Sequence, residues 1–283
     1  MTLSVTPLTD SMLRAWLPPR PRASHKGDYG HVLVVGGDHG MAGAVRLAGE
    51  AAARTGSGLV SVATRLAHAA VITAARPELM CHGVECARDL RSLLQRASVV
   101  AIGSGLGQSA WARDMLAAVL QTHLPLVVDA DALNLLAQEP MQCDHWILTP
   151  HPGEAARLLG ITTEQVQSDR PHAVQTLQQR YGGVCVLKGA GSLVCTSESI
   201  AICEAGNPGM ASGGMGDVLT GIIAGLLAQG LSLVDAACAG VYIHAKAGDR
   251  AAQEGERGLL ASDLMPYLRK LVNYNYVLNE HPD

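Results

Sequence analysis

The sequence predicts a single-domain α/β fold with a mostly parallel central sheet. Three observations predict it: an aliphatic composition, short apolar runs that alternate with helical patterns, and glycine-rich or charged loops that follow the runs. The 283 residues are 48% hydrophobic and 16% charged, which is enough for one large core. Because Phe is absent and only 3% of the residues are aromatic, aliphatic side chains must fill that core.

Six short apolar runs have the length and composition of buried parallel strands. They cover residues 31–35, 59–63, 98–102, 125–128, 145–148 and 183–187. Helical patterns cover residues 42–55, 110–123, 153–159 and 164–181, with closing helices near 217–229, 232–254 and 262–271. A hairpin is expected over residues 192–194 and 199–203. This alternation of strands and helices is typical of an α/β sheet.

The charge balance limits the kinds of partner. The formal net charge is −4, the pI is near 6.2, and no long run of Lys or Arg occurs. The sequence therefore predicts no basic surface that would bind a nucleic-acid backbone or an anionic membrane, and small-molecule partners are favoured. An anionic ligand would have to be held by backbone dipoles and a few cations, since the overall field is mildly repulsive to it.

The cysteines and the apolar stretches bear on location. Seven scattered cysteines form no Cys-x-x-Cys pair, which predicts a reduced, cytoplasmic protein. Residues 1–25 hold no apolar run long enough for a signal peptide. The most apolar stretch, residues 218–243, is interrupted by Gln229, Asp235 and four glycines, so we expect two buried helices there and no membrane span.

Five loops rich in glycine or charge each follow a predicted strand directly. They span residues 36–38, 103–107, 129–131, 149–154 and 188–192. In an open parallel sheet the ligand lies at the carboxyl ends of the strands, so these loops are expected to converge on one crevice. Ordinary turns would explain one or two such loops, but five of them favour a binding site.

A glycine-rich segment runs from Asn207 to Asp217 and enters an apolar helix. It stands in place of the common phosphate-binding motifs, because neither Gly-x-x-x-x-Gly-Lys-Ser/Thr nor a Gly-x-Gly-x-x-Gly after the first strand occurs. Its glycines would aim consecutive N–H groups at an anion, and the helix dipole would add positive potential.

Two roles are open to Asp217, where this segment meets the helix. A Gly-Asp pair ahead of an apolar run is usually a helix cap. The same position would keep a carboxylate ionised, with a low pKa, ready to accept a proton or orient a hydroxyl. Such a weak base suits phosphoryl transfer, which asks for positioning and charge neutralisation more than for strong proton abstraction. The two roles can coexist.

Charged residues in the other loops are candidates that also have simpler explanations. Lys188 precedes a glycine turn and could meet a nucleotide phosphate, although a Lys is usually a solvated surface residue. His151 and Glu154 bracket a helix start and could contact substrate and a hydrated Mg²⁺, while Glu154 alone would be an ordinary first-turn acid. Asp129 and Asp131 share that ambiguity. The other histidines show no trusted metal-ligand spacing.

Taken together, several motifs resemble those of the ADP/ATP-dependent NAD(P)H-hydrate dehydratases, a ribokinase-like family. The similarity runs from about Lys26 to Leu271. Its motifs lie at residues 26–30, 36–44, 75–78, 103–107, 129–134, 149–154, 188–192 and 207–217. Each motif alone is weak, whereas their common order and spacing are highly specific.

The resemblance implies a ribokinase-like three-layer α/β/α fold and the repair of damaged cofactor. Hydrated NADH or NADPH, called NAD(P)HX, would be phosphorylated on its ring hydroxyl by ADP or ATP with Mg²⁺, and the ring nitrogen would then expel phosphate. By match to the family motifs, Asp217 accepts the hydroxyl proton, and the amides of Gly213, Gly214 and Gly216 hold the transferred phosphoryl. The other implied contacts are Lys188, Gly189, Ala190, Gly191, Ser192, Asn207 and Gly216 for the nucleotide, Ala44, Gly105, His151 and Asp217 for NAD(P)HX, and Glu154 for Mg²⁺ through water.

Two departures from the family pattern are visible. Ser104 stands where family members often have Pro, which affects the stiffness of the loop. The family also often carries an epimerase domain ahead of the dehydratase, and residues 1–25 are too short to be one. Because residues 8–21 resemble the linker helix of such fusions, we expect residues 1–25 to be an extension or linker and residues 26–283 to be the dehydratase domain, free-standing or half of a fusion.

The resemblance further implies an NAD(P)HX epimerase as functional partner and a homo-oligomer, since family members are often tetramers. Two other functions stay open: a small-molecule alcohol kinase of the same fold, acting on a thiazole or pyrimidine, and a non-catalytic nucleotide sensor. Retention of Lys188, Asp217 and the whole glycine segment argues against the sensor. Turnover of hydrated NADH would separate the dehydratase from the kinase.

Overall fold

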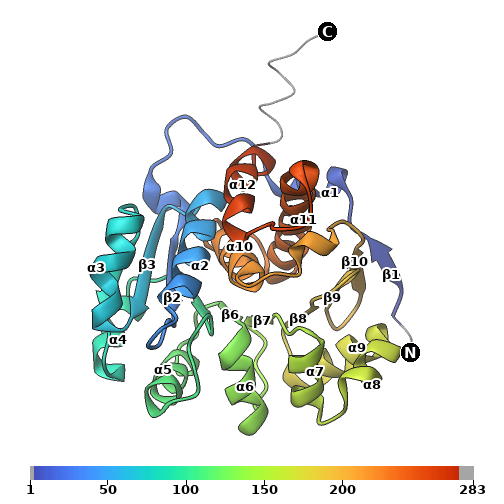
Figure 1. Cartoon of the computed structure of the whole chain (residues 1–283), viewed down its shortest axis with the longest axis horizontal. Coiled ribbons are helices and arrows are strands. Elements are labelled where there is room, and N and C mark those ends of the chain that lie inside the picture. Colours follow the sequence, from blue (N-terminus) through green and yellow to red (C-terminus); the bar gives the residue numbers. More distant parts are fainter. Residues whose placement is uncertain (1–2, 274–283) are drawn as a thin grey trace.

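A ten-stranded sheet divides the protein into three layers (Figure 1). The structure is a computed structural model that describes residues 3–273. The strands are β1 (Val5–Pro7), β2 (His31–Val35), β3 (Leu59–Thr64), β4 (Met80–Gly83), β5 (Val99–Ile102), β6 (Leu126–Val128), β7 (Trp146–Leu148), β8 (Val184–Leu187), β9 (Ser192–Cys195) and β10 (Ile200–Cys203). Their order is β1-β10-β9-β8-β7-β6-β5-β2-β3-β4, and β2 to β8 run parallel. The predicted α/β class with a mostly parallel sheet is confirmed.

Helices cover both faces of this sheet (Figure 1). One face carries α2 (Ala42–Thr55), α10 (Met215–Ala228), α11 (Leu233–Ala251) and α12 (Met265–Leu271), with α3 (Leu66–Ala75) at its edge beside β4. The other face carries α4 (Ala87–Leu94), α5 (Ala110–Leu120), α6 (Ala130–Gln138), α7 (Pro152–Leu159), α8 (Thr163–Ser168) and α9 (Arg170–Tyr181). Short 3-10 turns lie at Lys26–Tyr29, Pro208–Met210, Ala252–Glu254 and Ala261–Leu264.

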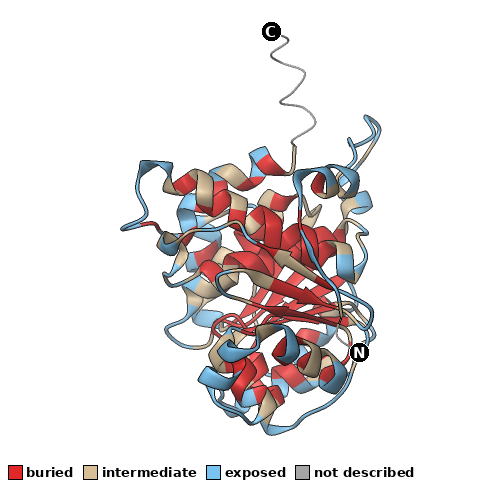
Figure 2. Cartoon of the chain, turned by 90° about the vertical axis from the view of Figure 1, so that its right-hand side faces the viewer, coloured by how far each residue is buried: buried red, intermediate tan, exposed pale blue. Residues whose placement is uncertain are grey.

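Alternation along the strands separates two hydrophobic cores. In β2, Val32 and Val34 face the layer of α2 and α10, whereas Leu33 and Val35 face the opposite layer. Successive side chains of a strand point to opposite faces, so a strand covered on both sides must be apolar throughout. Figure 2 shows the sheet and the helix surfaces that touch it as buried, with exposed residues on the outside.

Helix α10 is almost wholly buried, and two glycines let it lie close to α2. A Cβ on Gly221 would lie 2.1 Å from the Ala48 carbonyl oxygen, and one on Gly225 would lie 2.8 Å from that of Ala52. Any larger residue at Gly221 would push the helices apart. This close packing fixes the start of α10 at the carboxyl edge of the sheet.

The order of the strands reverses between β2 and β5. From β2 the chain proceeds outward through β3 and β4, and it then returns to the other side of β2 with β5. Loops on adjacent strands that lead in opposite directions leave a crevice between them, which is where open α/β sheets bind ligands. The loops after β2 and β5 therefore flank the expected binding crevice.

Most predicted elements lie within a few residues of the observed ones. The bounds of β2 and α2 and the hairpin of β9 and β10 are confirmed, and residues 218–243 form the two buried helices α10 and α11. The single helix predicted over residues 164–181 is wrong, because Asp169 ends α8 and caps α9 by accepting from the His172 amide at 3.0 Å. Five elements, β1, β4, α3, α4 and α6, were not predicted.

The segment before residue 26 joins the fold. β1 pairs parallel with β10, and the hydroxyl of Tyr242 on α11 donates to the Asp10 carboxylate of α1 (Asp10–Trp16) at 2.9 Å. The division into residues 1–25 and 26–283 stays a prediction, and its last ten residues lie outside the described part. In residues 3–273, no helix has the length and apolar character needed to cross a membrane. All seven cysteines are free thiols.

Candidate active site

The loops at the carboxyl edge of the sheet are joined by direct contacts. Between the loops after β2 and β5, the Asp38 amide donates to the Gly105 carbonyl oxygen at 2.7 Å. Between the loops after β7 and β8, the Lys188 amide donates to the Pro150 carbonyl oxygen at 2.9 Å. The Lys188 ammonium also lies 2.6 Å from the carboxylate of Asp129, which follows β6. The predicted convergence of the five loops is confirmed.

Asp129 is the centre of these contacts. Its Oδ1 accepts from Thr149 Oγ1 at 2.8 Å and from Lys188 Nζ at 2.6 Å, and its Oδ2 accepts from Thr220 Oγ1 at 2.9 Å. Asp129 is only 1% exposed. The next residue, Ala130, has a φ of 47°, a left-handed conformation that is uncommon outside glycine. One buried carboxylate thus ties the ends of β6, β7 and β8 to the first turns of α10.

Lys188 is not the solvated surface residue of the alternative interpretation. Its side chain is 18% exposed, and its Nζ lies 3.7 Å from Glu154 Oε2 in addition to its contact with Asp129. Burial alone would lower the pKa of Lys188, but the carboxylates of Asp129 and Glu154 outweigh burial and raise the pKa. The side chain therefore stays a cation beside Asp129 and Glu154.

The glycine segment and Lys188 face the same cleft. Helix α10 begins after Gly214, whose φ of 91° lies in the left-handed region that favours glycine. A Cβ on Gly216 would lie 3.4 Å from Lys188 Nζ and 3.5 Å from Asp129 Oδ2. Gly213 is exposed, and a Cβ there would meet nothing within 4 Å. Gly216 thus lies directly against Lys188 and Asp129, where a side chain would crowd the lysine.

Asp217 is the third residue of α10 and lies partly buried at this cleft. The residue at the cap position is Gly214, with no side-chain cap, so the alternative role of Asp217 as the helix cap is wrong. Burial raises the pKa of Asp217 to about 6; the Ser104 hydroxyl and Lys188 oppose the rise, and the Asp129 carboxylate adds to it. The expected low pKa is wrong, because loss of hydration outweighs the helix dipole. A carboxylate with this pKa is a better general base than the sequence suggested.

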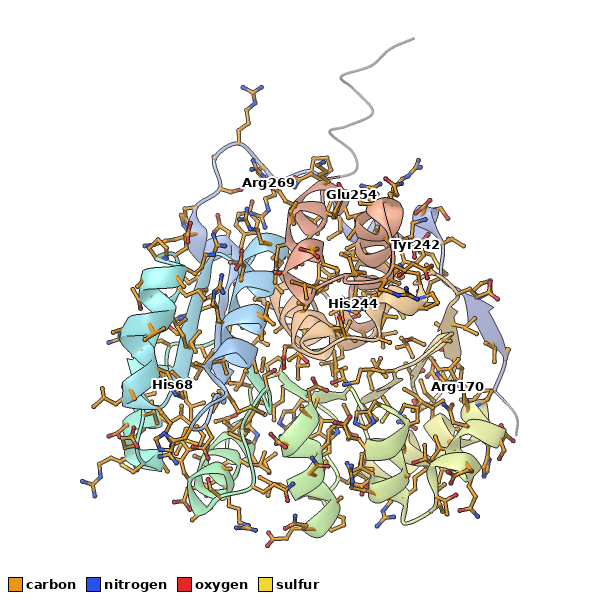
Figure 3. All side chains as sticks on the ribbon, in the orientation of Figure 1. His68, Arg170, Tyr242, His244, Glu254 and Arg269 are labelled. Atoms are coloured by element: carbon orange, nitrogen blue, oxygen red, sulfur yellow. The ribbon has the colours of Figure 1, made fainter. Side chains whose placement is uncertain are left out.

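Two buried polar atoms beside the cleft have no hydrogen-bond partner in the described part of the chain. They are Ser104 Oγ, close to Asp217 but without a hydrogen bond of ordinary geometry, and His244 Nε2. His244 lies on α11 near the backbone of Met215 (Figure 3). Burial lowers the pKa of His244 to about 4, so its ring is neutral at pH 7.

His151 and Glu154 cap the start of α7. His151 Nδ1 accepts from the Gly153 amide at 3.0 Å, and Glu154 Oε2 accepts from the His151 amide at 2.7 Å. The first-turn role predicted for Glu154 is therefore confirmed. Burial raises the pKa of Glu154, which is 5% exposed, while burial and the nearby Lys188 charge lower the pKa of His151.

The carboxylates of the cleft fit a hydrated magnesium ion better than a bare one. Within residues 3–273, no group of three His, Cys, Asp or Glu side chains is arranged to hold a metal. Glu154 Oε2 is already bonded to the His151 amide and lies 3.7 Å from Lys188 Nζ. Mg²⁺ usually keeps several waters and binds phosphates with one or two carboxylates. Such an ion could reach Glu154 through water.

Ala44 and Gly105 meet at the β2 and β5 end of the cleft. A Cβ on Gly105 would lie 3.1 Å from the Ala44 Cβ and 2.7 Å from the Met41 Cβ. Helix α2 begins here without a side-chain cap, and Met41 is 49% exposed. The structure therefore brings these two predicted contacts together at the strand reversal. The third, His151, lies on the loop after β7.

The predicted nucleotide contacts fall into two groups. Residues 188–192 form the turn between β8 and β9, in which Ser192 Oγ donates to the Gly189 carbonyl oxygen at 3.0 Å. Asn207 uses its side chain elsewhere, donating to Asp249 Oδ1 at 3.1 Å and accepting from the Gly209 amide at 3.0 Å. No hydrogen bond between described residues joins Asn207 to the turn.

Comparison with known proteins shows a relationship to the NAD(P)H-hydrate dehydratases over most of the chain. Residues 32–270 match the family model described as NAD(P)H-hydrate dehydratase. The chain belongs to this dehydratase family. A crystal structure of the ADP/ATP-dependent NAD(P)H-hydrate dehydratase of Bacillus subtilis, co-crystallised with ATP/Mg²⁺, superposes with a TM-score of 0.84 at 30% identity, covering 94% of this chain and 97% of the other. The dehydratase fold is ribokinase-like, as predicted.

Curated dehydratase relatives differ in length. The chain is 61% identical to the bifunctional NAD(P)H-hydrate repair enzyme of Coxiella burnetii, over 94% of this chain and 56% of that protein. It is 41% identical to the ADP-dependent (S)-NAD(P)H-hydrate dehydratase of Neisseria meningitidis, over 90% of this chain and 88% of that protein. The chain thus spans about half the length of the bifunctional relative and most of the shorter one.

The sequence alone leaves part of this site unresolved. It makes Asp129 one of several ambiguous acids, places Thr149 only within the loop 149–154, and assigns no role to Thr220. Asp129 and Thr149 each follow a strand directly, which is a usable signal for a ligand edge. Thr220 lies inside an apolar helix, where one hydroxyl gives no pattern.

Proposed function

We propose that this protein dehydrates (S)-NADHX and (S)-NADPHX to NADH and NADPH at the expense of ADP or ATP. The observation that carries the proposal is that the Asp217 carboxylate, the glycine-rich start of α10 and the Lys188 ammonium lie close together. The names of the relatives support this substrate and this nucleotide.

The reaction has two chemical steps. The terminal phosphoryl of ADP passes to the ring hydroxyl oxygen, AMP leaves, and the hydroxyl loses its proton; with ATP, the leaving product is ADP. The lone pair of the ring nitrogen then expels phosphate, and a proton leaves the neighbouring ring carbon to restore the double bond. Phosphorylation is needed because hydroxide is a poor leaving group.

The start of α10 would carry the first step. Asp217, with a pKa of about 6, is mostly ionised at pH 7 and can accept the hydroxyl proton. The amides of Gly213, Gly214 and Gly216 would stabilise the charge on the transferred phosphoryl, an effect of about 10²- to 10³-fold in rate per donor. These groups need no rearrangement to act together, because the helix N-terminus holds them in place.

The nucleotide would lie along the β8 side of the cleft. Lys188 and the amides of residues 188–192 would hold its phosphates, and Asn207 would take part from the segment ahead of α10. A hydrated Mg²⁺ held by the phosphates, with Glu154 reached through water, would neutralise charge during transfer. Ala44, Gly105 and His151 would contact the hydrated dinucleotide.

Incubation of the protein with hydrated NADH, ADP and Mg²⁺ tests this proposal. The dihydronicotinamide absorbance should return, with one AMP and one phosphate formed per NADH. A kinase of the same fold would leave the absorbance unchanged and release a phosphorylated alcohol, and a nucleotide sensor would bind ADP without turnover. Either result would overturn the dehydratase assignment.

Further expectations complete the proposal. An NAD(P)HX epimerase, as a separate protein or as the other half of a fusion, would supply the S epimer. A homotetramer in the cytoplasm is expected from the family and from the cysteine content. Sedimentation would measure the oligomeric state, and fractionation of cells would test the cytoplasmic location.

A further inference from the structure

An arginine from a helix lies behind the turn of residues 188–192. Arg170 is the first residue of α9 (Figure 3). Its Nη2 donates to the carbonyl oxygens of Gly191 at 3.1 Å and Leu187 at 3.3 Å, and its Nη1 donates to that of Lys188 at 3.4 Å. One guanidinium therefore serves three main-chain carbonyls of a single turn.

The turn closes tightly on this guanidinium. A Cβ on Gly189 would lie 2.9 Å from Arg170 Nη1 and 3.3 Å from Nη2. Gly189 has a φ of 140°, which side chains rarely adopt. The glycine and the arginine are thus matched to each other, and the arginine is partly buried beneath the turn.

Fixing the carbonyls also fixes the amides. In a planar trans peptide the N–H points opposite to the C=O, so carbonyls held toward α9 aim the next amides away from it. The Lys188 amide donates to the Pro150 carbonyl oxygen at 2.9 Å, and the Gly189 amide donates to Ser192 Oγ at 3.3 Å. These two bonds fix the shape of the turn, and within the described residues the amides of Ala190 and Gly191 are left without an acceptor.

The charge of Arg170 is not neutralised by a carboxylate. Between residues 3 and 273, no Asp or Glu forms an ion pair with its guanidinium, whereas Arg65 pairs with Asp38 and Glu85. A partly buried cation without an acidic partner leaves positive potential under the turn. That potential favours a phosphate on the turn's other side.

We propose that Arg170 is a positioning residue for the nucleotide, whose planar guanidinium holds the 188–192 turn so that the Lys188 ammonium and the amides of Ala190 and Gly191 face the phosphates of ADP or ATP. The inference rests on the proposed function of this turn. Arginine is required because its fork of donors can serve several carbonyls at once. A lysine would keep the charge but present only a point donor.

The test compares Arg170→Ala and Arg170→Lys with Arg180→Ala. Arg180 is a matched control, because it lies on the same helix and, among the described residues, donates only to the Leu159 carbonyl oxygen, at 3.5 Å. In nucleotide-free protein, both Arg170 variants should speed hydrogen exchange of the turn amides about tenfold or more, and the control should not. The ADP dissociation constant should rise about 10- to 100-fold in both variants, with KM for hydrated NADH unchanged within about twofold.

Unchanged exchange and unchanged ADP binding in Arg170→Ala would overturn the inference. Full recovery by Arg170→Lys would also overturn it, because charge alone would then suffice. If Arg170→Ala does not fold, Arg170→Gln is measured against the same criteria. If the unaltered protein did not turn over hydrated NADH, the proposed function would fail, whereas exchange and ADP binding would still decide the role of Arg170.

Discussion

The cleft is built from charged side chains at its β8 end and from backbone at its β2 and β5 end. At the first end, the partly buried Lys188 lies 2.6 Å from the buried Asp129. At the second, the Asp38 amide donates to the Gly105 carbonyl oxygen at 2.7 Å, and the Asp38 carboxylate is already paired with Arg65 at 2.7 Å.

This difference matches the two tasks that the cleft has to perform. Phosphoryl transfer needs fixed charges where charge develops, so buried ions with determined partners suit the β8 end. Binding a long dinucleotide needs close approach over a wide surface, which glycines and an open helix start provide. Substitutions at the two ends should therefore have separable effects on turnover and on substrate affinity.

The largest effect is expected at Asp217, the proposed general base. Asp217→Asn should lower kcat about 10³-fold, because the amide cannot accept the hydroxyl proton. ADP should still raise the melting temperature of the variant, since the glycine amides and Lys188 remain. Stopped assays of AMP and NADH would measure the loss. Turnover near that of the unaltered protein would remove Asp217 from the mechanism.

Lys188→Met should have the next largest effect. The methionine keeps much of the volume but removes the cation, so kcat/KM for ADP should fall about 10²-fold, the loss of a charged hydrogen bond of about 1.5–3 kcal/mol. The uncompensated Asp129 should also lower the free energy of unfolding, by about 3–5 kcal/mol. Initial rates at varied ADP would measure the loss in kcat/KM, and urea unfolding would measure the loss in stability. A variant with normal stability would show that the Asp129 pair is dispensable.

Gly105→Ala tests the β2 and β5 end, where we expect substrate affinity to change. The new Cβ would lie 2.7 Å from that of Met41, in a residue whose φ is 57°. We expect KM for hydrated NADH to rise about tenfold, while KM for ADP stays unchanged, since the distortion is confined to the β2 and β5 end. Rate measurements at saturating levels of each substrate in turn provide the comparison. An equal loss for both substrates would mean that the two ends are coupled.

The smallest expected effect is a pH dependence within the unaltered protein. Asp217 must be ionised to act as a base, and its pKa of about 6 places the loss of kcat on the acid side, half complete near pH 6. The carboxylate of Asp129 contributes to this value. A kcat that stays constant down to pH 4.5 would contradict the raised pKa.

The sequence predicted the elements whose side chains repeat with the period of their structure. β2 and α2 have clear apolar patterns, and their bounds are confirmed. α3 was missed because its residues are apolar on all sides although only Ile72 is buried, and β4 because Met80–Gly83 is a short edge strand with partly exposed side chains. Edge elements lack the two-sided burial that makes a pattern visible.

The site could be located from the sequence, but its electrostatics could not. Loops that follow parallel strands share an edge by topology, so their convergence did not require coordinates. The pKa of Asp217 depends on burial and on Asp129, which is distant in the sequence. The contact of Arg170 with the turn that begins at Lys188 likewise depends on the packing of α9, and no sequence motif predicts it.

The pairing of β1 with β10 has a practical consequence for anyone who shortens this chain. A version trimmed to start at Lys26 would lose the strand hydrogen-bonded along β10, together with the bond between Tyr242 and Asp10. The uncovered strand would offer free N–H and C=O groups to other copies, a common cause of aggregation. Expression designs should therefore retain the opening segment, whatever is joined ahead of it.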